Sequence, residues 1–300
     1  MNLQETINSR FGIGAALLIA KIIPPRLGIL LSKKAARFLA SKKTSPMVQS
    51  VRANQWIVSN QTMNEEELDS ITLKTFQHTA YCIYDLYHNM NKPQIIKERV
   101  QLSPSLVALL DQRVKCGEGT VIVAPHLSNF DLAGRAMALN GYRILALSYP
   151  QPKGGYQWQN DLRRDYGIDI IPMSFSALRT AKERLLDDEM ILTGLDRPMP
   201  QSNYHPKFFG YPCNVPVTYA KIALQTNSKM IVVACVGKDD GDYVIDHSPL
   251  ITLVHHADSV KELEINAESA LAAAENFIRQ RPHQWSMFFP VWPWSIEKMP

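Results

Sequence analysis

His126 and Asp131 are the two side chains whose types and spacing best suit proton transfer. Four residues separate them within residues 121–141, VIVAPHLSNFDLAGRAMALNG, which read as a buried strand followed by a helix. An imidazole can take a proton near neutral pH when a second group fixes its tautomer. Asp131, one helical turn beyond the strand end, can supply that group. The pair therefore predicts a general base and its orienting partner.

The same spacing has a purely structural interpretation. Ser128 can act as the N-cap of the helix, with Asp131 at the third helical position completing a capping box. His126 would then be only the end of a strand. That interpretation explains Asp131 better than His126, because ligands of parallel α/β sheets bind beyond the carboxyl ends of strands, where His126 emerges beside a helix N-terminus.

A nucleophile for this base is not evident in the chain. Ser128 is a candidate, but no GxSxG turn is present to expose a serine, so covalent catalysis is the weaker option. We therefore expect the nucleophile to arrive with the substrate. His126 would deprotonate an alcohol, which then attacks an activated carbonyl directly.

Short apolar runs alternating with amphipathic helices must position these residues. Continuous apolar strands separated by helices are typical of a largely parallel sheet buried on both faces. FFGYPCNVP, and DDGD before YVIDH, predict local hairpins, and a long helix is expected over residues 259–281. The expected strands are residues 120–124, 144–148, 168–173, 190–194 and 230–236, and the helices between them are 132–139, 157–165, 177–186 and 218–226.

Composition describes a folded globular chain of 300 residues, 46% hydrophobic and 20% charged. No repeat or Pro/Gly/Ser linker is visible, so residues 47–300 are expected to form one α/β domain. Four separated cysteines without metal-ligand spacing indicate free thiols in a reducing compartment. The glycines at 12 and 14 lack the rest of a dinucleotide fingerprint, so no nucleotide cofactor is expected. Because the cysteines lack metal-ligand spacing, no metal cofactor is expected either.

The N-terminal part, residues 1–46, combines positive charge with apolar runs. Up to Asn60 there are nine basic residues and one acid, whereas the remainder has 23 basic and 27 acidic residues. The apolar run at 11–20 is interrupted too soon to cross a bilayer and does not fit a signal peptide. A helix lying on an anionic membrane suits this composition better than nucleic acid does, although packing on the protein's own body is the alternative. The apolar side expected after the prolines comprises Leu27, Leu30, Leu31, Ala35, Phe38 and Leu39.

HLSNFD at residues 126–131 resembles the His, four residues, Asp motif of the glycerolipid acyltransferase superfamily. The surrounding pattern is similar to its branch of bacterial lipid A late acyltransferases and phosphatidylinositol mannoside acyltransferases. The spacing alone is weakly specific. Further matches in the same order are VRANQ from Val51, GLDR at 194–197, PKFFGYPCNVP from Pro206 and HQW at 283–285, which together span residues 47–294.

This resemblance implies an α/β/α sandwich with a mostly parallel central sheet and a membrane-associating N-terminal helical segment. It also implies transfer of a fatty acyl chain from acyl-CoA or acyl-carrier protein to a hydroxyl of a membrane lipid or glycolipid, without another cofactor. The expected location is the cytoplasmic face of the bacterial inner membrane, held peripherally. By motif position His126 is the base and Asp131 its partner, with Ser128 and Asn129 beside the substrate.

Other substrate-binding residues follow from the remaining motifs. Asp196 and Arg197 come after a strand, where the family keeps a polar pair, and the resemblance implies that both bind substrate. Arg197 would meet a phosphate or the developing oxyanion; alternatively, the two residues would form an ordinary loop ion pair. Relatives often carry a carboxylate before FFG, but this chain reads Tyr204-His205-Pro206-Lys207. His205 either replaces that carboxylate or is a loop histidine, and Lys207 either binds substrate or is solvated.

Two other functions remain open from the sequence. A thioesterase or hydrolase of the same architecture would use His126 to activate water, and would release free fatty acid whether or not a lipid alcohol is present. A membrane-bound scaffold would keep the fold without chemistry. The intact His126 and Asp131 pair argues against the scaffold.

Overall fold

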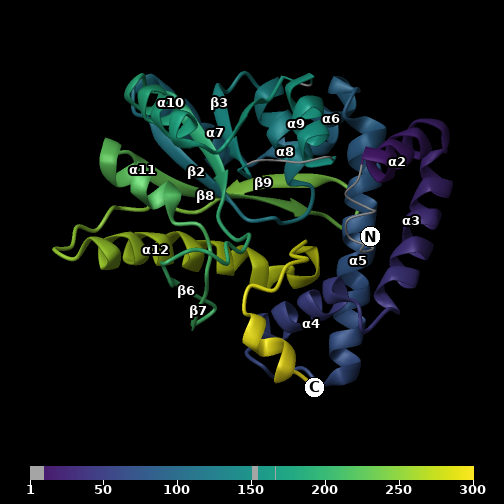
Figure 1. The fold of residues 1–300 in the computed structure, drawn as a ribbon. Helices are drawn as coiled ribbons and strands as arrows, with labels where there is room; N and C mark the ends of the chain where they lie inside the picture. The colour runs from purple at the N-terminus through teal and green to yellow at the C-terminus, as the bar shows by residue number, and fades with distance from the viewer. Residues whose placement is uncertain (1–9, 151–154, 166) are drawn as a thin grey trace.

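A seven-stranded sheet forms the centre of the protein (Figure 1). The computed structural model describes residues 10–150, 155–165 and 167–300. All neighbouring strands are parallel except β8 and β9, which confirms the mostly parallel sheet. Across the sheet the order is β1 (Val100–Leu102), β9 (Tyr243–His247), β8 (Lys229–Gly237), β2 (Thr120–Ala124), β5 (Met190–Gly194), β3 (Ile144–Ser148) and β4 (Asp169–Pro172).

Helices pack on both faces of this sheet because its central strands are apolar on both sides. On β2, Val121 and Val123 belong to one buried cluster and Ile122 to another, and all three are fully buried. Burying a side chain of this size stabilises the fold by about 1.5–3 kcal/mol. The first cluster includes α10 (Phe175–Leu186), α11 (Thr218–Thr226) and α12 (Ser259–Gln280), and the second includes α6 (Pro93–Arg99), α7 (Pro104–Lys115) and α8 (Phe130–Leu139).

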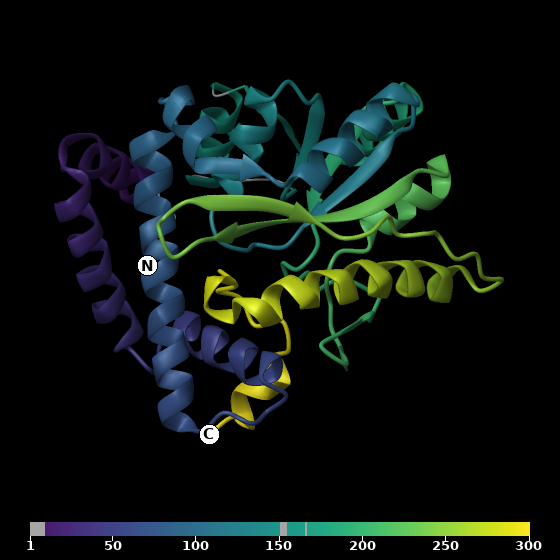
Figure 2. The ribbon, with the colours of Figure 1, turned by 180° about the vertical axis from the view of Figure 1, so that it is seen from behind.

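The N-terminal helices lie along one side of the molecule in both views (Figures 1 and 2). Asn64 and Glu67 form a complete capping box that starts the long helix α5. Gly28 lets α3 approach α5 closely, because a Cβ on this residue would lie 2.2 Å from the ring of Tyr84. The helices of this part are α2 (Arg10–Ile22), α3 (Pro25–Ala40), α4 (Pro46–Val58) and α5 (Glu65–Asn89).

The apolar side of α3 faces outward rather than the protein body. Leu27, Leu30 and Phe38 are 48%, 49% and 60% exposed, whereas Gly28 and Ala36 are buried. Exposed Lys33, Lys34 and Arg37 flank them. Of the helices in the described ranges, none has the length and apolarity needed to span a bilayer. Residues 1–9 of the expected N-terminal segment lie outside the described residues.

Both expected hairpins are present. β6 (Lys207–Phe208) and β7 (Tyr211–Pro212) pair antiparallel, while the turn after β8 leads into β9, which also pairs with β1 and so extends the main sheet. Three glutamates on α12 accept backbone N–H groups from residues of the first hairpin: Glu264 from His205, Glu268 from Lys207 and Glu275 from Phe209. The hairpin is therefore attached to α12. The remaining elements are α9 (Gly155–Asp165) and the short helices η1 (Pro282–Gln284) and η2 (Pro293–Glu297).

Candidate active site

Strand register brings His126 and Asp196 together. Ala124 at the end of β2 pairs with Gly194 at the end of the adjacent parallel strand β5, so the residues two positions further on emerge side by side. His126 Nδ1 lies 2.6 Å from Asp196 Oδ1, and the backbone N–H of His126 donates to Asp196 Oδ2 at 2.8 Å. The imidazole is thus fixed by both its ring and its backbone.

Asp196 is completely buried and remains a good acceptor. Trp285 Nε1–H donates to its Oδ2 at 2.7 Å, so the carboxylate accepts three hydrogen bonds. Burial by itself raises the pKa of Asp196, but the His126 charge and these hydrogen bonds outweigh burial and lower the pKa below its ordinary value. Asp196 is therefore an ionised group that holds the Nδ1 proton of His126.

The other ring nitrogen of His126 remains available for chemistry. The side chain is 28% exposed and lines a cavity, with its ring edge-on to Phe130 at a centroid distance of 5.0 Å. A Cβ on Gly194 would lie 3.3 Å from His126 Cε1, so glycine at this position leaves room for the ring. With Nδ1–H donating to Asp196, Nε2 carries the lone pair that can accept a proton.

Asp131 does not orient His126, so that prediction is wrong. Its carboxylate instead forms a two-pronged ion pair with Arg163 on α9, at 2.7 Å from Nε and 3.0 Å from the second nitrogen. Burial lowers the pKa of Arg163, but the Asp131 charge outweighs that effect and raises it. Asp131 lies in the first turn of α8, and its ion pair connects α8 to α9. The carboxylate that contacts the His126 imidazole is that of Asp196, which follows strand β5.

Ser128 is neither the N-cap of α8 nor a free nucleophile. It adopts a left-handed conformation with φ 50°, and its hydroxyl lies 3.0 Å from Nε2 of His78. Burial, and secondarily the His283 charge, lower the pKa of His78 to about 4, which makes its imidazole a weak base at neutral pH. The helix is capped by Asn129, whose side chain accepts the Leu132 N–H at 3.4 Å.

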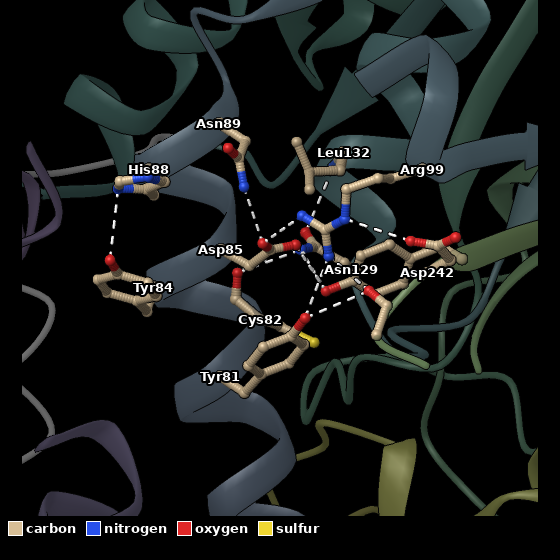
Figure 3. A network of polar contacts seen from close by, with 12 residues as sticks. Tyr81, Cys82, Tyr84, Asp85, His88, Asn89, Arg99, Asn129, Leu132 and Asp242 are labelled. Atoms are coloured by element: carbon tan, nitrogen blue, oxygen red, sulfur yellow. Dashed lines mark hydrogen bonds and ion pairs between the residues drawn. The ribbon is translucent and has the colours of Figure 1, made fainter. Parts of the chain in front are cut away.

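Asn129 belongs to a buried polar network (Figure 3), although it is also among the residues that line the cavity beside His126. Its amide donates to the Cys82 carbonyl at 3.2 Å and to the Tyr243 hydroxyl at 3.3 Å. Tyr243 donates to Asp85, and Arg99 forms an ion pair with the same carboxylate at 2.7 Å. Because these contacts use both ends of the Asn129 amide, this residue positions the start of α8 between α5 and β9.

His205 and Lys207 do not line the cavity, and their predicted substrate contacts stay predictions. His205 is exposed, with Nδ1 2.9 Å from Asn214 Oδ1, and Lys207 is exposed on β6. His205 precedes β6 and Lys207 begins it, and the backbone of both is bound to glutamates of α12. The carboxylate beside the His126 ring in the structure is that of Asp196.

A cavity of about 460 Å³ opens beside His126. This volume falls within the usual range for ligand pockets. Part of the lining is apolar and comes from α3, α4, α5 and the C-terminal segment, with Leu39, Met47, Phe76, Ile83 and Phe288. Another part comes from α9 and from residues beyond β3, β4 and β5, with Tyr149, Tyr156, Arg163, Met173, Arg197 and Met199.

Arg197 is directed into this cavity, and Asp196 is directed away from it. The two residues do not form the loop ion pair that was the alternative: Asp196 is used by His126 and Trp285, whereas Arg197 is surrounded by aromatic rings. Within the described residues no cluster of three or more His, Cys, Asp or Glu side chains is arranged to hold a metal ion. Among the described residues that line the cavity, the histidine and the charged groups that a bound molecule would meet are the His126 imidazole, the Asp131–Arg163 ion pair and the Arg197 guanidinium.

The fold and the site define an α/β protein with a histidine–carboxylate pair at the carboxyl edge of a mostly parallel sheet. The chain belongs to the bacterial lipid A biosynthesis acyltransferase family, which matches residues 3–293. It is 27% identical over 130 residues to a phosphatidylinositol mannoside acyltransferase of Mycobacterium tuberculosis, covering 42% of this chain and 41% of that protein. It is 25% identical over 183 residues to the protein of that name in Mycolicibacterium smegmatis, covering 59% and 57%. The matched part is thus under three fifths of each relative's length.

Proposed function

We propose that this protein is an O-acyltransferase that moves a fatty acyl chain from a thioester, acyl-CoA or acyl-carrier protein, to a hydroxyl of a membrane lipid or glycolipid. The observation that carries the proposal is the His126 imidazole, held through Nδ1 by buried Asp196 and lining a largely apolar cavity. Membership of an acyltransferase family supports it. The apolar lining suits an acyl chain, and the imidazole suits activation of an alcohol.

The reaction follows from the position of the free ring nitrogen. His126 Nε2 takes the proton of the acceptor hydroxyl while the oxygen attacks the thioester carbonyl. As the tetrahedral intermediate collapses, the carbon–sulfur bond breaks and the imidazolium returns the proton to the departing thiolate. Asp196 stays ionised throughout and stabilises the imidazolium. No acyl-enzyme is formed, which agrees with the buried Ser128 hydroxyl directed toward a weakly basic His78.

Negative charge on the intermediate would be stabilised from the start of α8. Phe130 and Asp131 form the first turn of this helix, and both line the cavity beside His126. A helix N-terminus favours an anion through its unpaired N–H groups and its dipole. The Asp131–Arg163 ion pair keeps α9 against this turn and so maintains the cavity wall.

Contact with a membrane is proposed through α3. Its exposed apolar side chains, flanked by lysines and an arginine, suit insertion into the headgroup layer of an anionic bilayer. Leu39 at the end of α3 and Ile83 on α5, which is itself 41% exposed, also line the cavity. A lipid acceptor could therefore pass from the bilayer into the site. We place the protein peripherally at the cytoplasmic face of the inner membrane.

The acceptor is proposed to be a glycolipid that also carries a phosphate. The names of the relatives from the two mycobacteria, phosphatidylinositol mannoside acyltransferases, describe acceptors of this kind for those proteins. The family description adds lipid A as a second such glycolipid. Both classes combine sugar hydroxyls, phosphate and acyl chains, which correspond to the polar and apolar parts of this cavity.

The test is transfer of a labelled acyl group to membrane lipids. Labelled acyl-CoA, or acyl-carrier protein in a parallel series, is incubated with total bacterial lipids, and the products are separated. We expect label in a lipid with the wild-type chain and none with His126→Gln, whereas the matched control His205→Gln should retain full activity because His205 does not line the cavity. Label only in free fatty acid, at the same rate with and without lipid, would indicate a hydrolase instead.

A further inference from the structure

The segment of residues 284–291, which we call the strap, leads from η1 toward η2 and lies against the loop that carries the general base. The backbone N–H of Ser286 donates to the carbonyl oxygen of His126 at 2.8 Å. Two residues further on in that loop, the N–H of Ser128 donates to the carbonyl oxygen of Gln284, also at 2.8 Å. The strap therefore runs alongside the residues that follow β2 and is bound to their backbone.

Trp285 is the strap residue that acts on the catalytic carboxylate. Its indole N–H donates to Asp196 Oδ2 at 2.7 Å, the same oxygen that accepts the backbone N–H of His126. The indole is buried between aromatic rings of the β6–β7 hairpin, with the centroids of Phe208 and Phe209 at 5.8 and 6.1 Å. Because these two donors occupy Oδ2, Oδ1 is left for the imidazole. The strap thereby helps to set the direction in which the carboxylate faces the base.

Asn54 on α4 fastens the strap from the other side. Its amide nitrogen donates to the carbonyl oxygens of Met287 and Phe289 at 3.1 and 2.9 Å, and its Oδ1 accepts the N–H of Val291 at 3.0 Å. Asn54 is buried, and the C-terminal segment passes beside α4 in both views (Figures 1 and 2). Residues 286–291 lie in neither a helix nor a strand, so their polar backbone groups need partners of this kind. One side chain satisfies three of them.

The sequence motifs VRANQ and HQW meet at these contacts. Gln55, next to Asn54, donates to the carbonyl oxygen of Pro282 at 2.8 Å, just before the strap begins. Gln284 exchanges two hydrogen bonds of 2.9 Å with the backbone of Gly237 at the end of β8. None of these three amide side chains is among the described residues that line the cavity. Any effect that they have on a reaction in the cavity must therefore pass through other residues.

We propose that Asn54, with Gln55 beside it, is a positioning residue for acyl transfer, because by fastening the strap it keeps the Trp285 indole on Asp196. The effect on the reaction rests on the proposed function, whereas the hold on the Asp196 contact does not. A carboxylate that loses its indole donor is free to rotate, so it holds the imidazole over a wider range of directions. Such freedom lowers kcat, since a general base must lie within hydrogen-bond reach of the proton that it takes.

The kinetic test combines Asn54→Ala with Trp285→Phe, which removes the indole donor and keeps an aromatic ring. Each single variant should lower kcat about 10- to 100-fold, as expected for loss of a hydrogen bond to a charged group. The loss in the double variant should fall short of the product of the two single losses by about fivefold or more, because both changes act through the Asp196 contact. A loss equal to that product would show that Asn54 acts elsewhere and would overturn the proposal. Wild-type kcat in Asn54→Ala would overturn it too.

Asn266 provides the matched control. It is a buried amide on α12 that accepts the N–H of Val254 at 2.9 Å and donates to the carbonyl oxygen of the same residue at 2.8 Å. Asn266→Ala therefore also leaves buried backbone groups unpaired, and it should lower the urea midpoint of unfolding about as far as Asn54→Ala does while kcat stays unchanged. A fall in kcat as large as that of Asn54→Ala would mean that lost stability slows the reaction, and would overturn the proposal.

A direct readout of the contact needs no turnover. The indole N–H of Trp285, assigned among the five tryptophans with Trp285→Phe in proton–nitrogen correlation spectra, should exchange slowly with solvent because it donates to a buried carboxylate. Its exchange should be about tenfold faster or more in Asn54→Ala and unchanged in Asn266→Ala. If no acyl group were transferred and this difference were present, only the proposed reaction would be refuted. Equal indole exchange in the wild type and Asn54→Ala would refute the role of Asn54.

Gln55→Met keeps the proposal testable if Asn54→Ala does not fold. It removes only the hydrogen bond to Pro282 and leaves an unbranched side chain in the buried site. We expect the exchange of the Trp285 indole to become about two- to tenfold faster in this variant, because one of the contacts that fasten the strap is lost. Indole exchange as slow as in the wild type would overturn the proposal.

Discussion

Replacing Asp196 by asparagine should change the tautomer of His126 without unfolding the protein. Oδ2 of the carboxylate accepts from two donors that cannot lose their hydrogen, the His126 backbone N–H and the Trp285 indole N–H. Oδ1 accepts from the His126 ring, whose proton can move. An asparagine at position 196 keeps two hydrogen bonds by placing its oxygen at the Oδ2 position. Its NH₂ group then faces Nδ1 of the imidazole.

The consequence is loss of the base rather than loss of binding. An amide donor that faces Nδ1 requires a lone pair on Nδ1, so the ring proton moves to Nε2. Nε2 is then protonated and cannot accept the proton of the acceptor hydroxyl. Losing the correct tautomer lowers kcat by on the order of 10³ to 10⁴, which corresponds to about 4–5.5 kcal/mol of transition-state stabilisation. Asp196 does not line the cavity, so KM should change little.

The assay is the initial rate of labelled acyl transfer over a range of donor and acceptor concentrations, with circular dichroism to verify the fold. Asp131→Asn is the matched comparison, because it neutralises the motif carboxylate that pairs with Arg163 instead of His126. We expect it to reduce kcat by about tenfold or less, since one charge-assisted hydrogen bond is worth roughly 1.5–3 kcal/mol and this one acts at a distance. If Asp131→Asn abolished transfer while Asp196→Asn kept a tenth or more of wild-type kcat, the assignment of roles would be refuted.

Three further outcomes are expected. The pKa of His78 in the folded protein, about 4, lies below its ordinary value of 6.5, so the unfolded chain takes up the proton first as the pH is lowered. The free energy of unfolding should therefore decrease by roughly 1.4 kcal/mol for each unit that the pH drops between 6.5 and 4. Urea unfolding of His78→Gln should lack that part of the pH dependence. Tyr243→Phe leaves buried Asp85 without one donor and should lower the unfolding free energy by about 1–3 kcal/mol, measured in urea. Serine replaces three exposed apolar side chains of α3 in the third variant, namely Leu27, Leu30 and Phe38. The affinity for anionic vesicles, measured by co-sedimentation, should decrease at least tenfold, and the melting temperature should not change.

The first and the third of these outcomes have a matched control. His205→Gln, at an exposed histidine whose ring lies against Asn214, should leave the loss of stability below pH 6.5 as in the wild type. Phe175→Ser removes an aromatic side chain that is 95% exposed on α10, away from the N-terminal helices, and should not affect vesicle binding. Equal loss of vesicle binding in this variant and in the α3 variant would contradict a specific membrane face on α3.

The central strands could be predicted from the sequence because burial on both faces leaves continuous apolar runs. β2, β3 and β5 begin and end at the expected residues. β1 has only three residues and β9 contains polar side chains, so neither shows such a run, and their pairing at the sheet edge was not predicted. The turn before β9 was predicted, but the chain gives no local sign that β9 also extends the main sheet.

The site could be predicted only in part, because strand order is a non-local property. His126 was found from its place after a strand. Its partner comes from 70 residues further along the chain, and only the adjacency of β2 and β5 brings Asp196 to the imidazole. The one signal in the sequence is that both residues stand two positions beyond the end of a strand. Arg163 and Trp285 carry no such signal, since each reaches the site from a different segment.

The tautomer of His126 tests the central claim most directly. Long-range proton–nitrogen correlation spectra of ¹⁵N-histidine-labelled protein, recorded where the ring is neutral and assigned with His126→Gln, distinguish a protonated Nδ1 from a protonated Nε2. The Asp196 contact requires hydrogen on Nδ1 and a bare Nε2 in the wild type, with the pattern reversed in Asp196→Asn. A wild-type ring protonated on Nε2, or a pattern unaffected by the asparagine, would contradict a base held by Asp196.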